Sequence, residues 1–239
     1  MMYRDILRSR SHQRYPDRAA APPGTSQPAS AGQRLAKRAF DFAVALFLLL
    51  LMSPLLVTAA ILVRVTTPGP ALFSQTRLGR HRRPFVLYKF RTMYTGSADN
   101  NHRDYVRKLL TQDEPPAVGK RGLYKLENDE RITPVGRLLR RTSIDELPQL
   151  LNVIRGDMSL VGPRPSLPWE ADLIHEVHCQ RFVVLPGLTG LWQVSGRNYL
   201  TMRQGLDLDI EYVQRQSFGF DLAILLKTVP VVLSTHGAL

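Results

Sequence analysis

Two adjacent carboxylates, Asp145 and Glu146, are the side chains of this sequence best suited to chemistry. Paired acids act as nucleophiles, as general acids and bases, or as metal ligands. The pair also follows Ser143 at the spacing of a capping box, in which Glu146 would only reach back to the start of a helix. In that structural interpretation the helix dipole alone favours Asp145 in the first turn. These residues leave both interpretations open.

Basic residues just before the pair favour chemistry at Asp145. Arg137, Arg140 and Arg141 precede it, and the start of a helix attracts anions. On a helical wheel Asp145 points away from the apolar stripe of the following helix, and a carboxylate in positive surroundings stays ionised at neutral pH. An ionised aspartate beside a phosphate site can form an aspartyl-phosphate intermediate when a cation separates the two anions. Mg²⁺ is the natural cation for carboxylates and phosphates.

Arg164 is a candidate phosphate ligand because a proline stands on each side of it. A rigid backbone would hold its guanidinium in one direction, as bidentate contact with a phosphate requires. A solvent-facing arginine in a proline-rich loop explains the same residues equally well.

Other polar side chains are expected near phosphates or at a membrane surface. Lys89 and Arg91 share one face of an expected strand, and Gln75 and Arg77 share one face of the strand before it. These side chains either bind phosphate or face lipid headgroups. Asp207 and Asp209 could contact a sugar or a metal, although acids on an exposed helix face are commoner.

An uncharged, strongly apolar stretch covers residues 42–63 and is long enough to cross a bilayer. Ser53 and Pro54 stand at its middle, where proline removes a helix hydrogen bond and serine can bond the freed carbonyl. Both flanks are basic, which favours the cytoplasm for both ends. A re-entrant helix-break-helix satisfies this rule. A kinked single span is the alternative, because membrane helices tolerate proline.

The elements that must position these residues are mostly helices. Alternation predicts two strands, at residues 71–75 and 85–90, joined by a basic turn. Helices are expected near residues 105–110, after Thr133-Pro134, from Ser143 to a stop at Gly156, at residues 201–214 and at residues 220–233. The last fits a helix lying on the membrane surface. The pattern predicts a mainly α fold with a small β element (α+β).

Composition restricts the class of protein. The chain has 239 residues, a net charge of +12 and a single cysteine, Cys179. One cysteine excludes an intrachain disulfide and a cysteine-rich zinc site, so a reducing compartment is expected. The basic centre of the chain indicates a polyanionic partner, which composition alone leaves open among nucleic acid, anionic lipid and a phosphorylated small molecule.

Several blocks in one order make the sequence similar to the bacterial sugar transferases, the monotopic polyprenyl-phosphate phosphoglycosyl transferases. The blocks are KRAFDFAVALFLLLLMSPLL, FSQTRLGRHRRPFVLYKFRTM, RRTSIDELPQLLNVIRGDMSLVGPRP and PGLTGLWQVSGRN. The resemblance runs from about residue 34 to the end and is to the short, exopolysaccharide-type form. It implies a re-entrant membrane helix at 34–64 and a cytoplasmic catalytic domain with membrane-surface amphipathic helices at 65–239. The segment before it, residues 1–33, is rich in Arg, Pro, Ala and Ser without a sustained apolar period, which predicts a disordered basic arm.

The resemblance implies transfer of a sugar 1-phosphate from a UDP-sugar to undecaprenyl phosphate, with release of UMP, at the cytoplasmic face of the bacterial inner membrane. Its partners would be these two substrates and membrane lipid, with no nucleic acid. A homodimer stays open, and its contacts would come from the catalytic part. The sugar is not identified by the sequence.

The resemblance also implies roles for single residues. Asp145 would be the nucleophile, and Glu146 would complete the acidic dyad as metal or proton partner, so that the pair holds Mg²⁺. Arg140 and Arg164 fall on phosphate-binding positions, and Ser53 and Pro54 on the break of the re-entrant helix. Three further residues match positions near the nucleotide-sugar: Lys89, Arg197 and Asp209.

A non-catalytic, membrane-tethered protein is the rival interpretation. Its basic middle would bind anionic lipid, polysaccharide or nucleic acid, and basic patches are usually just solvated or lipid-facing. Release of UMP from a UDP-sugar in the presence of polyprenyl phosphate and Mg²⁺ would exclude it.

Overall fold

The computed structural model describes residues 30–94, 129–196 and 200–233. Within these ranges the chain is mostly helical, with two small two-stranded sheets. The predicted mainly α fold with a small β element is therefore confirmed. The expected arm up to residue 29, the helix expected at residues 105–110 and Arg197 lie outside the described residues.

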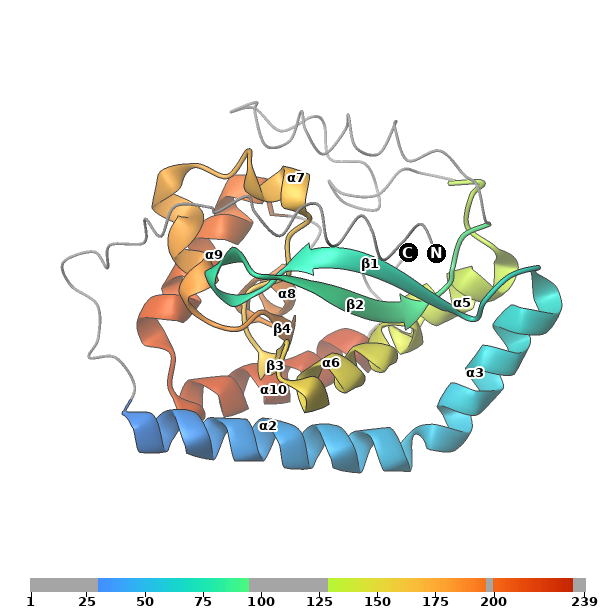
Figure 1. Ribbon diagram of the computed structural model, residues 1–239, viewed down its shortest axis with the longest axis horizontal. Coiled ribbons are helices and arrows are strands. Elements are labelled where there is room, and N and C mark those ends of the chain that lie inside the picture. Colours follow the sequence, from blue (N-terminus) through green and yellow to red (C-terminus); the bar gives the residue numbers. More distant parts are fainter. Residues whose placement is uncertain (1–29, 95–128, 197–199, 234–239) are drawn as a thin grey trace.

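The apolar stretch forms two helices that meet at a bend. Helix α2 (Ala31–Leu51) lies along one edge of the molecule, and α3 (Ser53–Thr66) turns away from it by 62° (Figure 1). Pro54 has no N–H to donate to the carbonyl of Leu50, and Ser53 Oγ donates to that carbonyl at 2.7 Å. The helix therefore breaks where Ser53 and Pro54 predict it.

Helix α2 begins earlier than expected. Ser30 and Gln33 form a capping box, in which each side chain bonds the other residue's backbone N–H. The helix therefore starts at Ala31, before the expected boundary at residue 34.

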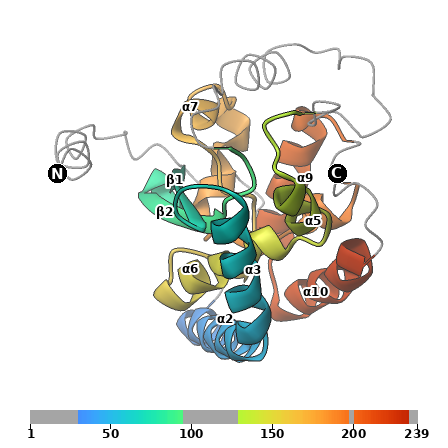
Figure 2. The same cartoon turned by 90° about the vertical axis from the view of Figure 1, so that its right-hand side faces the viewer.

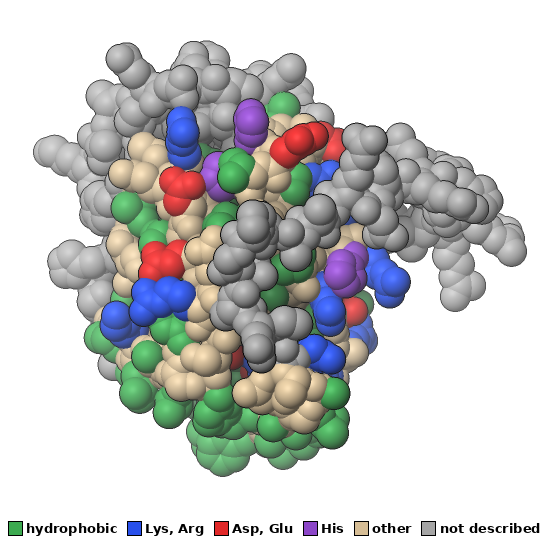
Figure 3. All heavy atoms as spheres, turned by 90° about the vertical axis from the view of Figure 1, so that its left-hand side faces the viewer, with side chains coloured by type: hydrophobic (Ala, Val, Ile, Leu, Met, Phe, Trp, Pro, Cys, Tyr) green, Lys and Arg blue, Asp and Glu red, His purple; other side chains and the backbone are tan. Residues whose placement is uncertain are grey.

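Helices α2, α3 and α10 (Phe218–Leu233) expose many large apolar side chains. No single described helix is long and apolar enough to span a membrane, but α2 and α3 together meet that test by length and composition. Helices α2 and α10 lie side by side (Figures 1 and 2), and apolar side chains gather at that end of the molecule (Figure 3). The exposed apolar residues of these two helices include Phe42, Leu46, Phe47, Leu50, Leu51, Leu222, Leu226 and Val229. Such a continuous apolar surface is typical of a contact with lipid or with another protein.

Two strands, β1 (Leu72–Leu78) and β2 (Pro84–Phe90), form an antiparallel hairpin. Phe73 lies opposite Lys89, and residues opposite each other in such a pair point to the same face. Arg77 points to that face as well, because side chains alternate along a strand. The two polar faces that the sequence predicted separately are therefore one face of the hairpin.

The remaining described elements surround a core that includes Leu150, Met158 and Tyr212. In Figure 1 helix α6 lies between the hairpin and α2. The elements are α5 (Pro134–Arg141), η2 (Ile144–Gln149), α6 (Leu150–Arg155), β3 (Ser159–Val161), α7 (Pro168–Ala171), η3 (Glu176–Val183), β4 (Gly187–Thr189), α8 (Leu191–Val194) and α9 (Met202–Arg215). Strands β3 and β4 pair in parallel.

Local signals set the ends of two of these helices as predicted. Thr133 Oγ1 accepts from the Gly136 N–H at 2.8 Å and caps the start of α5. Gly156 ends α6 with a φ of 91°, in the left-handed region that favours glycine.

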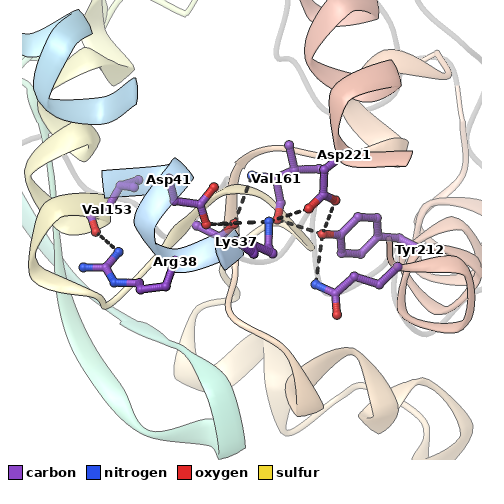
Figure 4. A network of polar contacts seen from close by, with 9 residues as sticks. Lys37, Arg38, Asp41, Val153, Val161, Tyr212 and Asp221 are labelled. Atoms are coloured by element: carbon purple, nitrogen blue, oxygen red, sulfur yellow. Dashed lines mark hydrogen bonds and ion pairs between the residues drawn. The ribbon is translucent and has the colours of Figure 1, made fainter. Parts of the chain in front are cut away.

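A buried polar network joins α2 to the rest of the molecule (Figure 4). Lys37 Nζ lies 2.5 Å from Asp221 Oδ2 on α10 and 3.6 Å from Asp41 Oδ2. Ser159 Oγ donates to Asp41 at 2.7 Å, and the Tyr212 hydroxyl donates to Asp221 at 2.8 Å. Burial raises the pKa of Asp221, and the neighbouring Lys37 charge opposes that rise. The two carboxylates therefore depend on one lysine for compensation.

Arg38, the next residue of α2, binds the end of α6. Its guanidinium donates to the carbonyl oxygens of Val153 at 2.5 Å and Ile154 at 2.7 Å. The last carbonyls of a helix have no partner within that helix, so a side chain of α2 satisfies the C-terminus of α6.

We expect Lys37→Met to destabilise the folded protein by about 2–3 kcal/mol at pH 7, because it leaves two buried carboxylates without their cation. The change removes the charge that lowers the pKa of Asp221, so this pKa rises further above its unfolded value of about 4. A folded-state pKa above the unfolded value destabilises the folded protein at pH values where the carboxyl is ionised in the unfolded chain, and the cost grows as pH rises toward the folded pKa. The loss of stability in Lys37→Met is therefore smaller at pH 5 than at pH 7. Thermal unfolding in detergent at both pH values measures it.

Lys227→Met is the matched control, because Lys227 lies exposed on the same helix as Asp221. It should change stability by less than about 0.5 kcal/mol. An equal loss at pH 5 and pH 7 in Lys37→Met would contradict an electrostatic role and indicate lost packing.

Candidate active site

Asp145 and Glu146 lie on η2, a short 3₁₀ helix that packs against β2 and α5. Asp145 is 8% exposed, and Glu146 is half-buried. The predicted capping box is wrong: Ser143 has a φ of 56° and its side chain makes no cap hydrogen bond. Pro148 has no N–H for the helical bond to Ile144, which keeps the segment from forming the regular first turn of an α-helix.

Lys89, Arg140 and Arg77 supply positive charge around the two acids. Burial, together with the charges of Arg77 and Arg140, lowers the pKa of Lys89 to about 8, although the charges of Asp145 and Glu146 oppose the change. Burial likewise lowers the pKa of Arg140, and the charge of Asp145 opposes it most. The structure therefore brings five charged side chains from β1, β2, α5 and η2 into one electrostatic environment.

Fixed contacts orient two of these cations. Arg140 Nε donates to Thr92 Oγ1 at 2.8 Å. Arg77 donates to Gln75 Oε1 at 2.8 Å and to the carbonyl oxygen of Pro165 at 3.1 Å. Arg77, whose charge acts on Lys89, therefore connects the hairpin to the proline-flanked loop of Arg164.

Arg91 has a structural role, and its expected place beside Lys89 as a phosphate or headgroup ligand is wrong. Its guanidinium is buried and donates to the carbonyl oxygens of Thr67 at 2.9 Å and Pro68 at 2.7 Å. These carbonyls follow the end of α3, so Arg91 fixes the hairpin to α3.

Arg164 and Asp209 belong to a second group, in which Arg181 contacts both the Arg164 backbone and the Asp209 carboxylate. The Arg164 side chain is exposed, whereas Asp209 is 1% exposed and its Oδ2 lies 2.7 Å from Arg181 Nη2. Burial raises the pKa of Asp209 to about 6, opposed first by the charge of Arg181 and also by Arg164 and His178. Asp209 is therefore not the acid on an exposed helix face that its type suggested.

Two buried residues in this region were missed from the sequence. Arg181 stands in a segment without a motif, and only its long-range partners reveal it. Asn152 is fully buried; its Nδ2 donates to the Val86 carbonyl at 2.7 Å and its Oδ1 accepts from the Tyr88 N–H at 3.2 Å. Asn152 joins α6 to the edge of β2, and no pattern in the neighbouring sequence predicts this contact.

The donor set for Mg²⁺ is small. Among the described residues, no group of three or more His, Cys, Asp or Glu side chains could hold a metal ion. Mg²⁺ is commonly bound by one or two carboxylates together with substrate phosphates. Asp145 and Glu146, adjacent and on one segment, fit that requirement.

Comparison with known proteins gives the family. The model of the family described as "Bacterial sugar transferase" matches residues 32–235. The chain is 41% identical over 211 residues to the undecaprenyl-phosphate galactose phosphotransferase of Salmonella typhimurium, covering 88% of this chain and 43% of that protein. It thus spans less than half of that relative.

Two other relatives are closer in length. The chain is 41% identical over 205 residues to the exopolysaccharide production protein ExoY of Rhizobium meliloti, covering 85% of this chain and 88% of ExoY. It is 44% identical over 213 residues to the UDP-glucose:undecaprenyl-phosphate glucose-1-phosphate transferase of Caulobacter vibrioides, covering 85% of this chain and 72% of that protein. With the family model matched over nearly all of the described residues, the chain belongs to the bacterial sugar transferase family of enzymes.

Proposed function

We propose that this chain transfers a sugar 1-phosphate from a UDP-sugar to undecaprenyl phosphate and releases UMP, as the first membrane step of exopolysaccharide or glycan assembly. The observation that carries the proposal is the acidic pair of buried Asp145 and half-buried Glu146, whose charges act on the neighbouring cations Lys89 and Arg140. The names of the Salmonella and Caulobacter relatives describe transfers of this kind.

Asp145 is the proposed nucleophile. Its carboxylate oxygen attacks the sugar-bearing phosphorus, a new P–O bond forms, and the bond from that phosphorus to the UMP oxygen breaks. UMP leaves with the electron pair, and a phosphosugar remains on Asp145. A phosphate oxygen of undecaprenyl phosphate then attacks the same phosphorus, which frees Asp145 and yields the lipid diphosphate sugar.

The surrounding cations would stabilise the charge that develops on the phosphoryl oxygens. Arg140, oriented by Thr92, and Lys89 stand next to the acidic pair. Arg164 offers an exposed planar guanidinium suited to bidentate phosphate contact. Mg²⁺, held by Asp145 and Glu146, would screen the carboxylates from the substrate's diphosphate.

We place the enzyme on the cytoplasmic face of the inner membrane, with α2 and α3 as a re-entrant pair. The support is the 62° bend between two apolar helices and the exposed apolar side chains that α2, α3 and α10 present. The lipid carrier resides in the membrane, so a surface of this kind would bring the acidic pair to its phosphate. A purely polyanion-binding role is the weaker candidate, because it gives no reason to place two adjacent acids, one of them buried, among the cations.

We expect Asp145→Asn to abolish UMP release from a UDP-sugar panel with undecaprenyl phosphate and Mg²⁺, because the change is nearly isosteric and removes the nucleophilic charge. Glu211→Gln, which removes an acid from an exposed ion pair on α9, is the control and should keep at least half of the activity. Mass spectrometry of the wild type with UDP-sugar and no acceptor should find a phosphosugar on the peptide containing Asp145. Substantial turnover by Asp145→Asn would refute the covalent mechanism.

The lowered pKa of Lys89 predicts a pH dependence. Below about pH 8 the free enzyme carries the Lys89 cation, and above it the amine is neutral. The value of kcat/KM for the UDP-sugar should therefore fall as pH rises through about 8. Lys89→Arg should remove this fall, because a guanidinium stays charged. If the fall persists unchanged in Lys89→Arg, another group causes it.

The bend predicts a topology. Ser53→Ala with Pro54→Leu creates a continuous apolar helix that can span about 30 Å of hydrocarbon. In that variant an Ala31→Cys label, introduced in a Cys179→Ser background, should react with an impermeant reagent added outside the inner membrane, and activity should fall. The same label in the otherwise unchanged chain should not react. Reaction in the latter would show a single span and would overturn the re-entrant proposal.

A further inference from the structure

The loop that carries Arg164 is held along its whole backbone. Four successive carbonyl oxygens, those of residues 163–166, each accept a hydrogen bond from a distant part of the chain. In order, the donors are the Gly187 amide at 2.9 Å, the Arg181 guanidinium at 2.6 Å, the Arg77 guanidinium at 3.1 Å and the Leu78 amide at 2.9 Å. The backbone is therefore fixed while the Arg164 side chain stays exposed.

Arg181 is the donor that binds this loop through two residues. One of its nitrogens, Nη2, donates to the carbonyl of Arg164, and the other, Nη1, donates to the hydroxyl of Ser166. Arg181 is 4% exposed. A buried guanidinium is costly unless an anion compensates it, and Asp209 is that anion, with Oδ2 at 2.7 Å from Nη2.

Burial excludes Asp209 from direct contact with a ligand. Asp209 is 1% exposed, and the charged groups facing it are Arg181, Arg164 and His178. Arg164 and Arg181 also line one small pocket. An acid in this place acts on a bound phosphate only through the arginines.

We propose that Asp209 and Arg181 are positioning residues: Asp209 holds the Arg181 guanidinium, and Arg181 fixes the loop so that Arg164 presents its guanidinium to the phosphates of the sugar nucleotide. This inference rests on the proposed function. It replaces the role near the nucleotide-sugar that the sequence resemblance implied for Asp209, since the carboxylate serves the loop and not the sugar.

Hydrogen exchange tests the loop without any turnover. Asp209→Asn and Arg181→Lys should each speed exchange of the amides that bond the loop carbonyls, those of Leu78 and Gly187, by at least about tenfold, because a charge-assisted bond is lost. Glu211→Gln is the control: it breaks an exposed ion pair with Arg215 on the same helix as Asp209. It should leave exchange at the loop unchanged.

A double-mutant cycle tests the link to Arg164. Asp209→Asn alone should lower kcat/KM for the UDP-sugar by about tenfold. In an Arg164→Ala background the same change should lower it less than twofold, because the residue that it positions is already gone. Arg181→Lys should show the same non-additivity, and Glu211→Gln should have no effect in either background.

The outcomes separate the two proposals. A full tenfold loss from Asp209→Asn in the Arg164→Ala background, or unchanged exchange at the loop, overturns the positioning role. If Asp209→Asn does not fold, Arg181→Lys, which keeps the charge beside Asp209, tests the positioning role in its place. The measurements are the same: hydrogen exchange at the loop and non-additivity with Arg164→Ala. Absence of UMP release by the wild type refutes the proposed function, and the exchange result then still decides whether Asp209 fixes the loop.

Discussion

The Lys37 cation between the buried carboxylates of Asp41 and Asp221 is the interaction on which the rest of the structure depends. Helix α2 exposes apolar side chains on one side, so its attachment must come from the opposite side. Asp41 and Ala45 are buried there, and Ser159 and Lys37 compensate Asp41 directly. Buried charges are costly when unpaired. Sliding α2 along the domain would separate Lys37 from Asp221, so one position of α2 is favoured.

That register reaches the acidic pair through a short chain of contacts. Arg38 of α2 satisfies the last carbonyls of α6, and α6 continues directly from η2, which carries Asp145. Gly156 contributes because a Cβ there would lie 3.4 Å from the Arg38 guanidinium, and because its φ of 91° would strain another residue. On the opposite side, the Asn152 amide fixes α6 to β2 and so to the strand of Lys89. The apolar helix α2 and the proposed nucleophile thus share one rigid support.

Local chemistry made part of this structure predictable. The break at Ser53 and Pro54 and the helix end at Gly156 follow from backbone rules that act within a few residues. The same short-range rules gave the wrong start for the helix at Ser143, because its left-handed φ places the side chain away from a capping position. For Asp209 no local rule exists: residue type and helical position suggest an exposed acid, and only the long-range approach of Arg181 makes it a buried partner. Pairings of that kind are decided by the tertiary fold, which a single sequence does not display.

The hydrogen bonds from Arg38 of α2 to the end of α6 restrict how a water-soluble form of the enzyme could be made. Deleting the apolar helices would also delete Arg38 and Lys37, uncover the terminal carbonyls of α6 and leave Asp221 buried without its cation. The domain would lose part of its own interior along with its membrane surface. Polar replacements confined to the outward residues, such as Phe47 and Leu50 at 62% and 65% exposed, would instead change the solvent that the protein prefers while keeping every contact that holds the acidic pair in place.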